Sequence, residues 1–236
     1  MGQIHTTSHA TASSKIPAEA QEAVDLPAGE VQHPYFWDGL KIICRVGATL
    51  LFDLKAWGTH HVPKKGGAII VSNHQSFLDP ILLGVRLRRP VSYMARSDLF
   101  SKPAFTWLIR QLNAFPVRRG ESDLGAMKQA IARVQQGRVL IMFPEGTRTS
   151  DGNVHALQPG IGLLARRADV PVIPAVIDGS FAAWPRGQFL PYPHPIRVMY
   201  GAPLAIEGLK ASQIVELIGQ TLPKMLDELR RIGEAP

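Results

Sequence analysis

The sequence predicts an α/β fold, a mostly buried mixed sheet flanked by helices, preceded by an amphipathic helical segment suited to a membrane interface. From residue 66 onward, short apolar runs alternate with stretches of helical periodicity, which is the pattern of α/β domains. The runs are near-continuous and rich in β-branched residues, as in strands that are covered on both faces. The candidate strands are Ala68–Ser72, Val91–Ala95, Phe115–Val117, Val139–Phe143, Val172–Ile177 and Ile196–Tyr200.

Capping residues mark three helices between and after these strands. Asp79 and Pro80 form an N-cap and first-turn pair, a combination that opens helices. Pro223 is expected to interrupt the last helix, because proline cannot donate the backbone hydrogen bond that a helix interior requires. The expected helices run from Asp79 towards Arg89, from Ser122 to Gly137, and onward from Ser212.

Composition limits the kinds of protein that this chain can be. With 236 residues, of which 45% are hydrophobic and 19% charged, it can form one full domain and a small appendage. Its single cysteine, Cys44, excludes an intramolecular disulfide and a cysteine-based zinc cluster. Residues 1–33 carry a net charge of −3, so the total of +7 leaves +10 for residues 34–236. A field of that sign attracts phosphorylated metabolites, anionic lipids or nucleic acid.

The chain divides into three expected parts. Residues 1–33 lack aromatic residues and show no periodicity, so we interpret them as a disordered leader without a secretory signal. Residues 34–57 form the amphipathic segment, and residues 58–236 form the α/β domain.

The segment 34–57 combines an apolar stripe with regularly placed charges. Its apolar residues recur every three or four positions, with tryptophans near both ends, as in helices that lie in a membrane interface. Its longest uncharged run, residues 46–52, is far shorter than the roughly 20 apolar residues that a transmembrane helix needs. The same stripe also suits a helix packed on the domain, and periodicity does not choose between these interpretations. The residues expected at the membrane are Trp37, Leu50, Leu51, Leu54 and Trp57.

A first candidate site follows the strand at 68–72. His74 and Asp79 lie at the carboxyl end of this strand, the edge at which α/β sheets bind ligands. Five positions on one continuous helix would separate the two side chains by about 140°, so a His–Asp contact requires a turn between them. In such a contact, Asp79 holds one imidazole nitrogen and leaves the other as a general base. The alternative is that His74 merely caps a loop and Asp79 a helix.

The nucleophile for such a base is expected to be a substrate hydroxyl. No serine in the chain has the G-x-S-x-G context of a nucleophile elbow. A direct attack by a hydroxyl that His74 deprotonates is therefore the simpler hypothesis.

A second candidate site, suited to an anionic ligand rich in oxygen, follows the strand at 139–143. Arg148 can donate two parallel hydrogen bonds to a phosphate, and Gly146 lets backbone N–H groups approach it. Glu145 can hold a hydroxyl or orient an arginine, although a turn with a structural Glu–Arg pair explains the same residues. Arg119 closes the strand at 115–117 and can face the same edge.

Four blocks of the sequence, taken together and in order, resemble the motifs of the glycerolipid acyltransferases, the family of 1-acylglycerol-3-phosphate acyltransferases. The first is the H-x-x-x-x-D block, N-H-Q-S-F-L-D, at residues 73–79. The others are N-A-F-P-V-R-R at 113–119, F-P-E-G-T-R at 143–148 and V-P-V-I-P at 170–174. The H-x-x-x-x-D spacing is common by itself, whereas the ordered set, across about residues 60–205, is specific.

The resemblance implies a role for each motif residue. His74 is the general base on the acceptor hydroxyl, and Asp79 orients it. The acyl donor is a thioester, either acyl-CoA or acyl-carrier-protein, and no metal or other cofactor is implied. The second block opens with Asn113 where the family usually has Gly, and Gln158 stands where the family often has Lys, so phosphate recognition depends more on arginine. The residues implied at the glycerol-phosphate site are Arg119, Glu145, Gly146, Thr147 and Arg148.

The expected activity is transfer of a fatty acyl group to the free hydroxyl of 1-acylglycerol 3-phosphate, at the cytoplasmic face of a membrane. The same chemistry on a lyso-ornithine lipid, a lysophospholipid or glycerol 3-phosphate is an alternative, and so is a non-catalytic peripheral membrane-binding protein. A nucleic-acid partner is not expected, because the chain has no recognisable nucleic-acid motif. The sequence does not fix the oligomeric state or the preferred acyl chain length.

Overall fold

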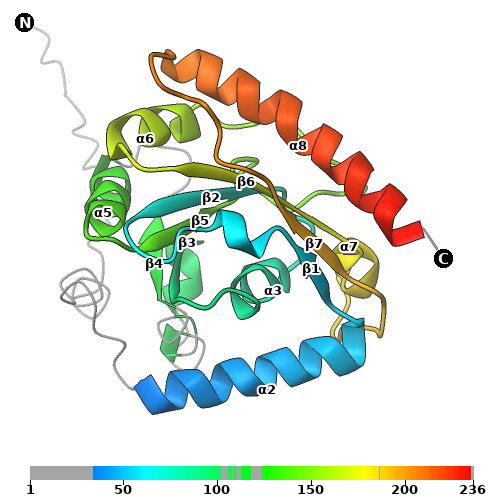
Figure 1. Ribbon diagram of the computed structural model, residues 1–236. Coiled ribbons are helices and arrows are strands. Elements are labelled where there is room, and N and C mark those ends of the chain that lie inside the picture. Colours follow the sequence, from blue (N-terminus) through cyan, green and yellow to red (C-terminus); the bar gives the residue numbers. More distant parts are fainter. Residues whose placement is uncertain are drawn as a thin grey trace, which may run out of the picture.

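Seven strands form one mixed sheet in the order β1-β7-β6-β2-β5-β3-β4 (Figure 1). Neighbouring strands are parallel except for β6 and β7, which are antiparallel. This computed structural model describes residues 34–101, 106–107, 109, 113–117, 124–185 and 187–234, so the leader expected over 1–33 lies outside the described residues. The strands are β1 (Lys55–Trp57), β2 (Ala68–Ser72), β3 (Val91–Arg96), β4 (Ala114–Val117), β5 (Val139–Met142), β6 (Val172–Asp178) and β7 (Arg197–Tyr200).

Helices cover both faces of the sheet (Figure 1). One face carries α5 (Leu124–Gln135), α6 (Gly160–Ala168) and α8 (Ala211–Glu234). The other carries α2 (Pro34–Phe52) and α3 (Asp79–Val85), and the single turn α7 (Ser180–Ala183) follows β6. Two short 3-10 helices span Thr59–His61 and Ser97–Ser101. The mostly buried mixed sheet flanked by helices is therefore confirmed.

The central strand β2 explains why both faces need cover. All five of its residues are buried, and their side chains alternate between two apolar clusters. Ile70 belongs to the cluster beneath α2 and α3, whereas Ile69 and Val71 belong to the cluster beneath α5, α6 and α8. Because β5 and β6 run parallel to β2 on either side, the residues that follow these three strands meet at one edge.

The sequence predicted six of the seven strands and missed β1. Residues 34–57 were expected to be helical throughout, but α2 ends at Phe52 and β1 begins at Lys55. Asp53 makes the break with a φ of 39°, a left-handed conformation that aspartate tolerates better than most residues. The chain then turns back, and β1 pairs in parallel with β7.

This break corrects one of the residues expected at the membrane. Leu50 and Leu51 on α2 are 79% and 51% exposed, as a lipid contact requires. Leu54 follows the break and is only 1% exposed, inside the apolar cluster, so its expected place at the membrane is wrong. Trp57 lies on β1, partly buried against the cluster beneath α8. The side chain of Trp37 is not among those that the structure describes.

The helix α2 buries Ala48 and Phe52 against the domain, bonds two of its cations to backbone carbonyls and leaves several apolar side chains exposed. The ammonium of Lys41 donates to the carbonyl oxygens of Leu87 and Arg89 at 3.2 and 3.4 Å. The guanidinium of Arg45 donates to the carbonyl of Val85, at the end of α3, at 3.1 Å. Among the described side chains of α2, the exposed large apolar ones are Ile42, Ile43, Val46, Leu50 and Leu51.

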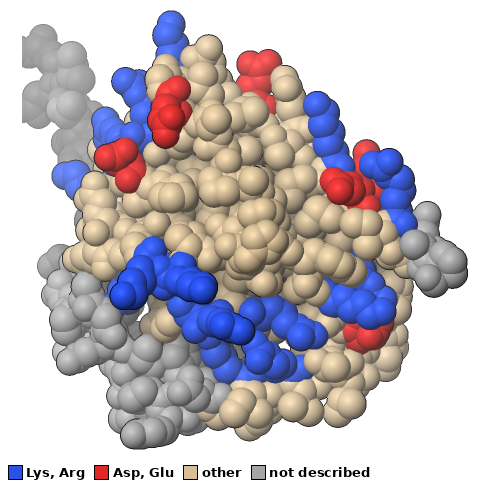
Figure 2. Space-filling model, viewed as in Figure 1, with Lys and Arg blue, Asp and Glu red and all other residues tan. Residues whose placement is uncertain are grey.

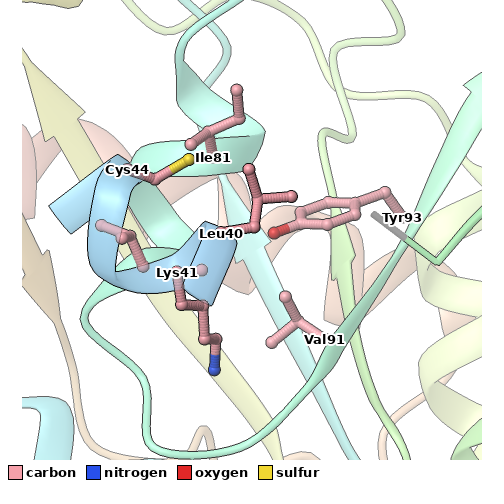
Figure 3. A pocket seen from close by; sticks show the side chains of 8 residues that line it. Leu40, Lys41, Cys44, Ile81, Val91 and Tyr93 are labelled. Atoms are coloured by element: carbon pink, nitrogen blue, oxygen red, sulfur yellow. The ribbon is translucent and has the colours of Figure 1, made fainter. Parts of the chain in front are cut away.

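A small apolar cavity of about 30 Å³ separates α2 from α3 and β3 (Figure 3). The hydroxyl of Tyr93 points into it towards Leu40, and Cys44 lies beside Ile81 (Figure 3). Burial raises the pKa of the Cys44 thiol. Among the described helices, none is both long enough and apolar enough to span a bilayer.

The helix α8 is continuous through Pro223, so the interruption expected there is wrong. Its inward face buries Ile218, Leu222 and Leu226 in the cluster that also contains residues of β6 and α6. Packing along this face compensates for the one backbone hydrogen bond that proline cannot donate.

Candidate active site

Polar residues follow β2, β5 and β6 where these strands end, and they meet at one edge of the sheet. The register pairs Val71 with Met142 of β5 and Ser72 with Ala175 of β6. The residues that follow these paired positions therefore lie close together, beyond the carboxyl ends of the strands. His74 comes from β2, Glu145 from β5 and Asp178 with Ser180 from β6.

His74 and Asp79 are in direct contact, as predicted. The Nδ1 atom of His74 lies 2.8 Å from Oδ2 of Asp79. The histidine side chain is 18% exposed, whereas the carboxylate is completely buried. The imidazole also stacks on Phe143, with 4.1 Å between the ring centroids and 22° between the planes. One nitrogen is therefore held by a carboxylate, and Nε2 is the nitrogen that can act on a substrate.

The turn between them depends on the same carboxylate. Oδ2 of Asp79 accepts the backbone N–H groups of Gln75 and Ser76 at 2.6 and 2.7 Å. These bonds bend the chain back after β2, so the five-residue separation becomes a contact. The N-cap of α3 is Leu78, one position before the predicted cap Asp79, and the helix ends at Val85 rather than towards Arg89.

Ser180 completes the surroundings of Asp79 and was not predicted. Its hydroxyl donates to Oδ1 of Asp79 at 2.6 Å and lies 3.2 Å from Oε1 of Gln75. Gln75 in turn donates to the carbonyl of Gly152 at 2.8 Å and to Asp178 at 3.3 Å. Both oxygens of the Asp79 carboxylate thus have donors, which fixes its orientation.

Asn73 was also missed, and it joins β2 to β6 beyond the last paired residues. Its side-chain oxygen accepts the N–H of Ile177, and its amide donates to the carbonyl of the same residue, both at 2.9 Å. The side chain is completely buried and acts as one more rung of the sheet. The residue before His74 is consequently fixed against β6.

Glu145 contacts backbone groups rather than open solvent. Its two oxygens accept the N–H groups of His74 and His155 at 2.9 and 3.1 Å, and the residue is only 4% exposed. Burial raises the pKa of this carboxyl, and the two backbone hydrogen bonds oppose that rise. Thr149 donates its N–H to the carbonyl of His74 at 2.7 Å. The 143–148 block therefore positions the backbone of His74, a function that the sequence did not reveal.

Gly146 forms the turn but does not offer its N–H to a ligand. Its φ is 68°, a left-handed conformation that glycine adopts without strain. Its N–H donates to the carbonyl of Phe143 at 3.1 Å. This amide is therefore engaged within the turn, and the neighbouring residue Thr147 is exposed.

Arg148 lies over an aromatic ring from the first block. Its guanidinium carbon is 3.6 Å from the ring centroid of Phe77, which is 50% exposed. The ring of Trp184 lies 5.9 Å from that of Phe77. A cation on such a ring gains about 0.5–1 kcal/mol at an exposed site and more when desolvated. The predicted phosphate residue Arg119 lies outside the described residues.

No group of three or more histidine, cysteine or acidic side chains able to hold a metal ion occurs within the part of the chain that the structure describes. The rings of His60 and His61, which are adjacent in the sequence, have centroids 4.1 Å apart and are tilted by 48°. His61 is held by the carbonyl of Tyr200 at 2.9 Å, on β7 and away from His74.

A buried carboxylate holding a half-buried histidine, at the carboxyl ends of parallel strands, defines a class of α/β protein with a histidine–carboxylate site. The sequence model of the family described as Acyltransferase matches residues 53–178, just over half of the 236 residues. The chain belongs to this acyltransferase family. Both the His74–Asp79 block and the 143–148 block lie inside the matched region.

Curated relatives carry the name 1-acyl-sn-glycerol-3-phosphate acyltransferase. The protein from Bacillus subtilis is 29% identical over 143 residues, which are 60% of this chain and 69% of that protein. The one from Pseudomonas aeruginosa is 28% identical over 179 residues, 74% of this chain and 67% of that protein. Against two plant relatives, from Brassica napus and Limnanthes douglasii, the chain spans 35% and 59% of their length.

The fold is similar to a crystal structure of the 1-acyl-sn-glycerophosphate (LPA) acyltransferase PlsC from Thermotoga maritima. The TM-score is 0.72 at 24% sequence identity, and the match covers 90% of this chain and 88% of that one. This likeness covers more of the chain than residues 53–178, which the family model matches.

Proposed function

We propose that this acyltransferase moves a fatty acyl group from a thioester to the free hydroxyl of 1-acylglycerol 3-phosphate, giving phosphatidate for phospholipid synthesis. The family membership and the shared name of the relatives support this activity. The observation that carries it is the 2.8 Å contact between His74 and the buried Asp79.

In the proposed reaction, Nε2 of His74 accepts the proton of the acceptor hydroxyl as its oxygen attacks the thioester carbonyl. The tetrahedral intermediate then expels the thiolate, and the imidazolium returns the proton to the leaving sulfur. The carboxylate of Asp79 keeps the Nδ1 proton in place and stabilises the imidazolium between these steps. His74 therefore acts in turn as base and acid, and no covalent acyl-enzyme is required.

The acceptor phosphate is proposed to bind at the rim beside this histidine. Arg148 and Arg119 supply the guanidinium groups and Thr147 a hydroxyl, while Glu145 and Gly146 hold the turn that carries Thr147 and Arg148. Arginine suits this task because its planar fork donates two parallel hydrogen bonds to phosphate oxygens. Acyl-CoA and acyl-carrier-protein both present the required thioester, and we expect no resident metal or other cofactor.

Membrane lipids are the expected partner of α2. Its exposed face carries Leu50 at 79% and Ile43 at 69% exposure, whereas Lys41 and Arg45 donate to backbone carbonyls of the domain. Figure 2 shows Lys and Arg side chains gathered in a band directly above the uncharged edge that α2 occupies in Figure 1. An apolar helix bordered by cations favours a surface of anionic lipid. We therefore propose a monotopic enzyme on the cytoplasmic face of a membrane, with no nucleic-acid partner.

A neutral residue at position 158 supports a second class of acceptor, a lysolipid with another headgroup. Gln158 stands where the family often has lysine. Its Cγ lies close to Gly146, since a Cβ placed on that glycine would be 3.4 Å from it. A neutral residue beside the 143–148 block suits a headgroup other than a phosphate monoester, such as that of a lyso-ornithine lipid or a lysophospholipid.

The direct test is acyl transfer by the purified chain from labelled acyl-CoA, or acyl-carrier-protein, into a panel of acceptors. The panel holds lysophosphatidate, glycerol 3-phosphate, lysophosphatidylethanolamine and a lyso-ornithine lipid. The proposal predicts the highest kcat/KM for lysophosphatidate and none above background for His74→Ala. Preference for another lysolipid would reassign the acceptor, and absence of transfer into all of them would leave only a membrane-binding protein.

A further inference from the structure

The segment between α7 and β7 exposes large apolar side chains near the candidate active site. We call residues 187–192 the apolar loop. Phe189, Leu190 and Tyr192 of this loop are 90%, 65% and 57% exposed. None of the three belongs to either apolar cluster of the core. Single exposed apolar residues are ordinary, but three within four positions form a patch that indicates an interaction surface.

The apolar loop is anchored at its base. The N–H of Tyr192 donates to the carbonyl of Ala183 at 2.7 Å, and the indole N–H of Trp184 donates to the carbonyl of Gln188 at 3.0 Å. Polar backbone groups are thus used inside the loop, while its apolar side chains face outward. This arrangement leaves the exposed side chains free to enter an apolar medium without breaking these hydrogen bonds.

The base of the loop touches the residues that surround the catalytic pair. The hydroxyl of Ser76 donates to the carbonyl of Trp184 at 3.2 Å, and the Trp184 ring lies 5.9 Å from that of Phe77. Ser180, four residues before Trp184, donates to Asp79. A partner that binds the apolar loop would therefore also fix the position of the residues at the rim of the site.

The other end of the loop meets the end of α2. The N–H of Ile196 donates to the carbonyl of Phe52 at 2.8 Å, and Lys55 pairs with Arg197. Ile196 lies six positions after Leu190, a distance of at most about 22 Å for an extended chain. Figure 1 shows this segment passing the carboxyl-terminal end of α2, where Leu50 and Leu51 are exposed. Two apolar surfaces more than 130 residues apart in the sequence are thereby brought together.

We propose that the apolar loop inserts into the lipid monolayer beside α2, so that two elements on different sides of the active-site rim hold it against the membrane. The partner is lipid, because the loop continues the exposed apolar face of α2 and because residues 34–236 carry a net charge of +10, which favours an anionic bilayer. Phenylalanine, leucine and tyrosine are also the side chains that enter interfaces most readily. This inference rests on the proposed function, in which the acceptor is a membrane lipid.

The test places a reporter on the loop. In a Cys44→Ala background, which removes the only cysteine of the chain, Leu190→Cys carries an environment-sensitive fluorophore. Vesicles of phosphatidylglycerol and phosphatidylcholine, with or without brominated acyl chains, are then added. We expect a blue shift and quenching by the brominated lipid. Leu124→Cys, at a position 60% exposed on α5, is the matched control and is expected to show neither.

A second variant measures how much the loop contributes. Phe189→Ser with Leu190→Ser is expected to weaken vesicle binding about 10- to 100-fold, since two large apolar side chains lose their burial. Leu124→Ser is expected to leave it unchanged. Parent protein that does not bind vesicles, or binds them with the Leu190 label unquenched, would overturn the inference. So would a label shift that depends on protein concentration and marks a second copy as the partner.

Failure of the proposed function gives a different result. If the Leu190 label is quenched but the chain acylates no lysolipid, the loop inference stands and the proposed activity fails. If the chain acylates vesicle-borne lysophosphatidate while the label stays unquenched, the activity stands and the loop inference fails.

Discussion

Two regions of the molecule differ in which groups they bury: the sheet edge around His74 buries polar groups, whereas the helix α2 exposes apolar ones. At the edge, Asp79, Asn73 and Glu145 are buried, and each has both side-chain acceptor or donor groups engaged. On α2, two cations bond to carbonyl groups of the domain while five large aliphatic side chains are exposed. The difference sets buried polarity, which fixes one imidazole with little freedom, against exposed apolarity, on which the proposed contact with lipid depends.

The largest expected effect comes from removing the imidazole of His74. His74→Ala should lower acyl transfer by about 10²–10⁴-fold or more, because general-base catalysis is lost. The fold should persist, since the buried neighbours of Asp79 are unchanged. Initial rates with lysophosphatidate and thermal unfolding of the same preparation measure both quantities.

Asp79→Asn is the companion variant. The amide cannot accept from every donor around Asp79, so it mis-sets the imidazole tautomer, and activity should also fall sharply. Activity of His74→Ala within tenfold of the parent would contradict the assignment of the base.

The second effect compares the leucines before Asp53, where α2 ends, with the leucine after it. Leu50→Ser with Leu51→Ser should leave the unfolding temperature unchanged but release the protein from anionic vesicles, since each leucine contributes about 1.5–3 kcal/mol of burial. Leu54→Ala should do the reverse, and cost about 2–5 kcal/mol of folding free energy by opening a cavity in the core. Vesicle flotation and urea unfolding of both variants check this. Equal flotation of the double variant and the parent would mean that α2 does not face lipid.

The third effect tests whether Glu145 is a positioning residue. Glu145→Gln offers one acceptor to two backbone N–H donors, so one donor should be left unsatisfied at a cost of about 1–3 kcal/mol. We expect lower kcat with little change in the KM for acceptor, because His74 loses a restraint but the rim does not. A raised acceptor KM with normal kcat would show instead that Glu145 contacts the substrate.

The pH dependence of the same pair of proteins follows from the pKa of Glu145. Because burial raises this pKa in the folded state, its contribution to stability is fully present below the unfolded pKa and is lost as pH rises through the folded pKa. The glutamine variant lacks this contribution. The free energy of unfolding of the parent should therefore decrease relative to that of the variant as pH increases from about 4 upward.

The smallest expected effect concerns the ring beneath Arg148. Phe77→Leu removes the cation–π contact, worth about 0.5–2 kcal/mol, and should raise the acceptor KM by roughly 2- to 30-fold. Phe77→Tyr keeps the ring face and should restore the parent value. A change in the thioester KM in place of the acceptor KM would move Arg148 to the donor site.

Local signals made much of the fold and the catalytic pair predictable. Six strands could be predicted from buried, β-branched runs, and the His74–Asp79 contact from a proline-marked helix start close to a strand end. Both depend on residues within about ten positions of one another. The order of the strands and the presence of β1 depend instead on pairing with distant segments, such as β7.

The residues that support His74 and Asp79 could not be recognised from the local sequence. Ser180 lies 101 positions from Asp79, and the carbonyl and N–H of Ile177 lie 104 positions from Asn73. A serine or asparagine in a loop has many uses, so only the fold shows which one each has. Leu54 was misplaced for a similar reason, because apolar periodicity continued across the left-handed Asp53 that ends the helix.

The most direct test of the central claim compares lysophosphatidate with monoacylglycerol as acceptors in the same vesicles. The two differ by the phosphate, so they separate recognition at Arg148 and Arg119 from partition into the membrane. The account predicts a kcat/KM for lysophosphatidate higher by about 10-fold or more, since a charge-assisted hydrogen bond contributes about 1.5–3 kcal/mol. Equal values of kcat/KM for the two acceptors would contradict it and assign these arginines to the donor or to the fold.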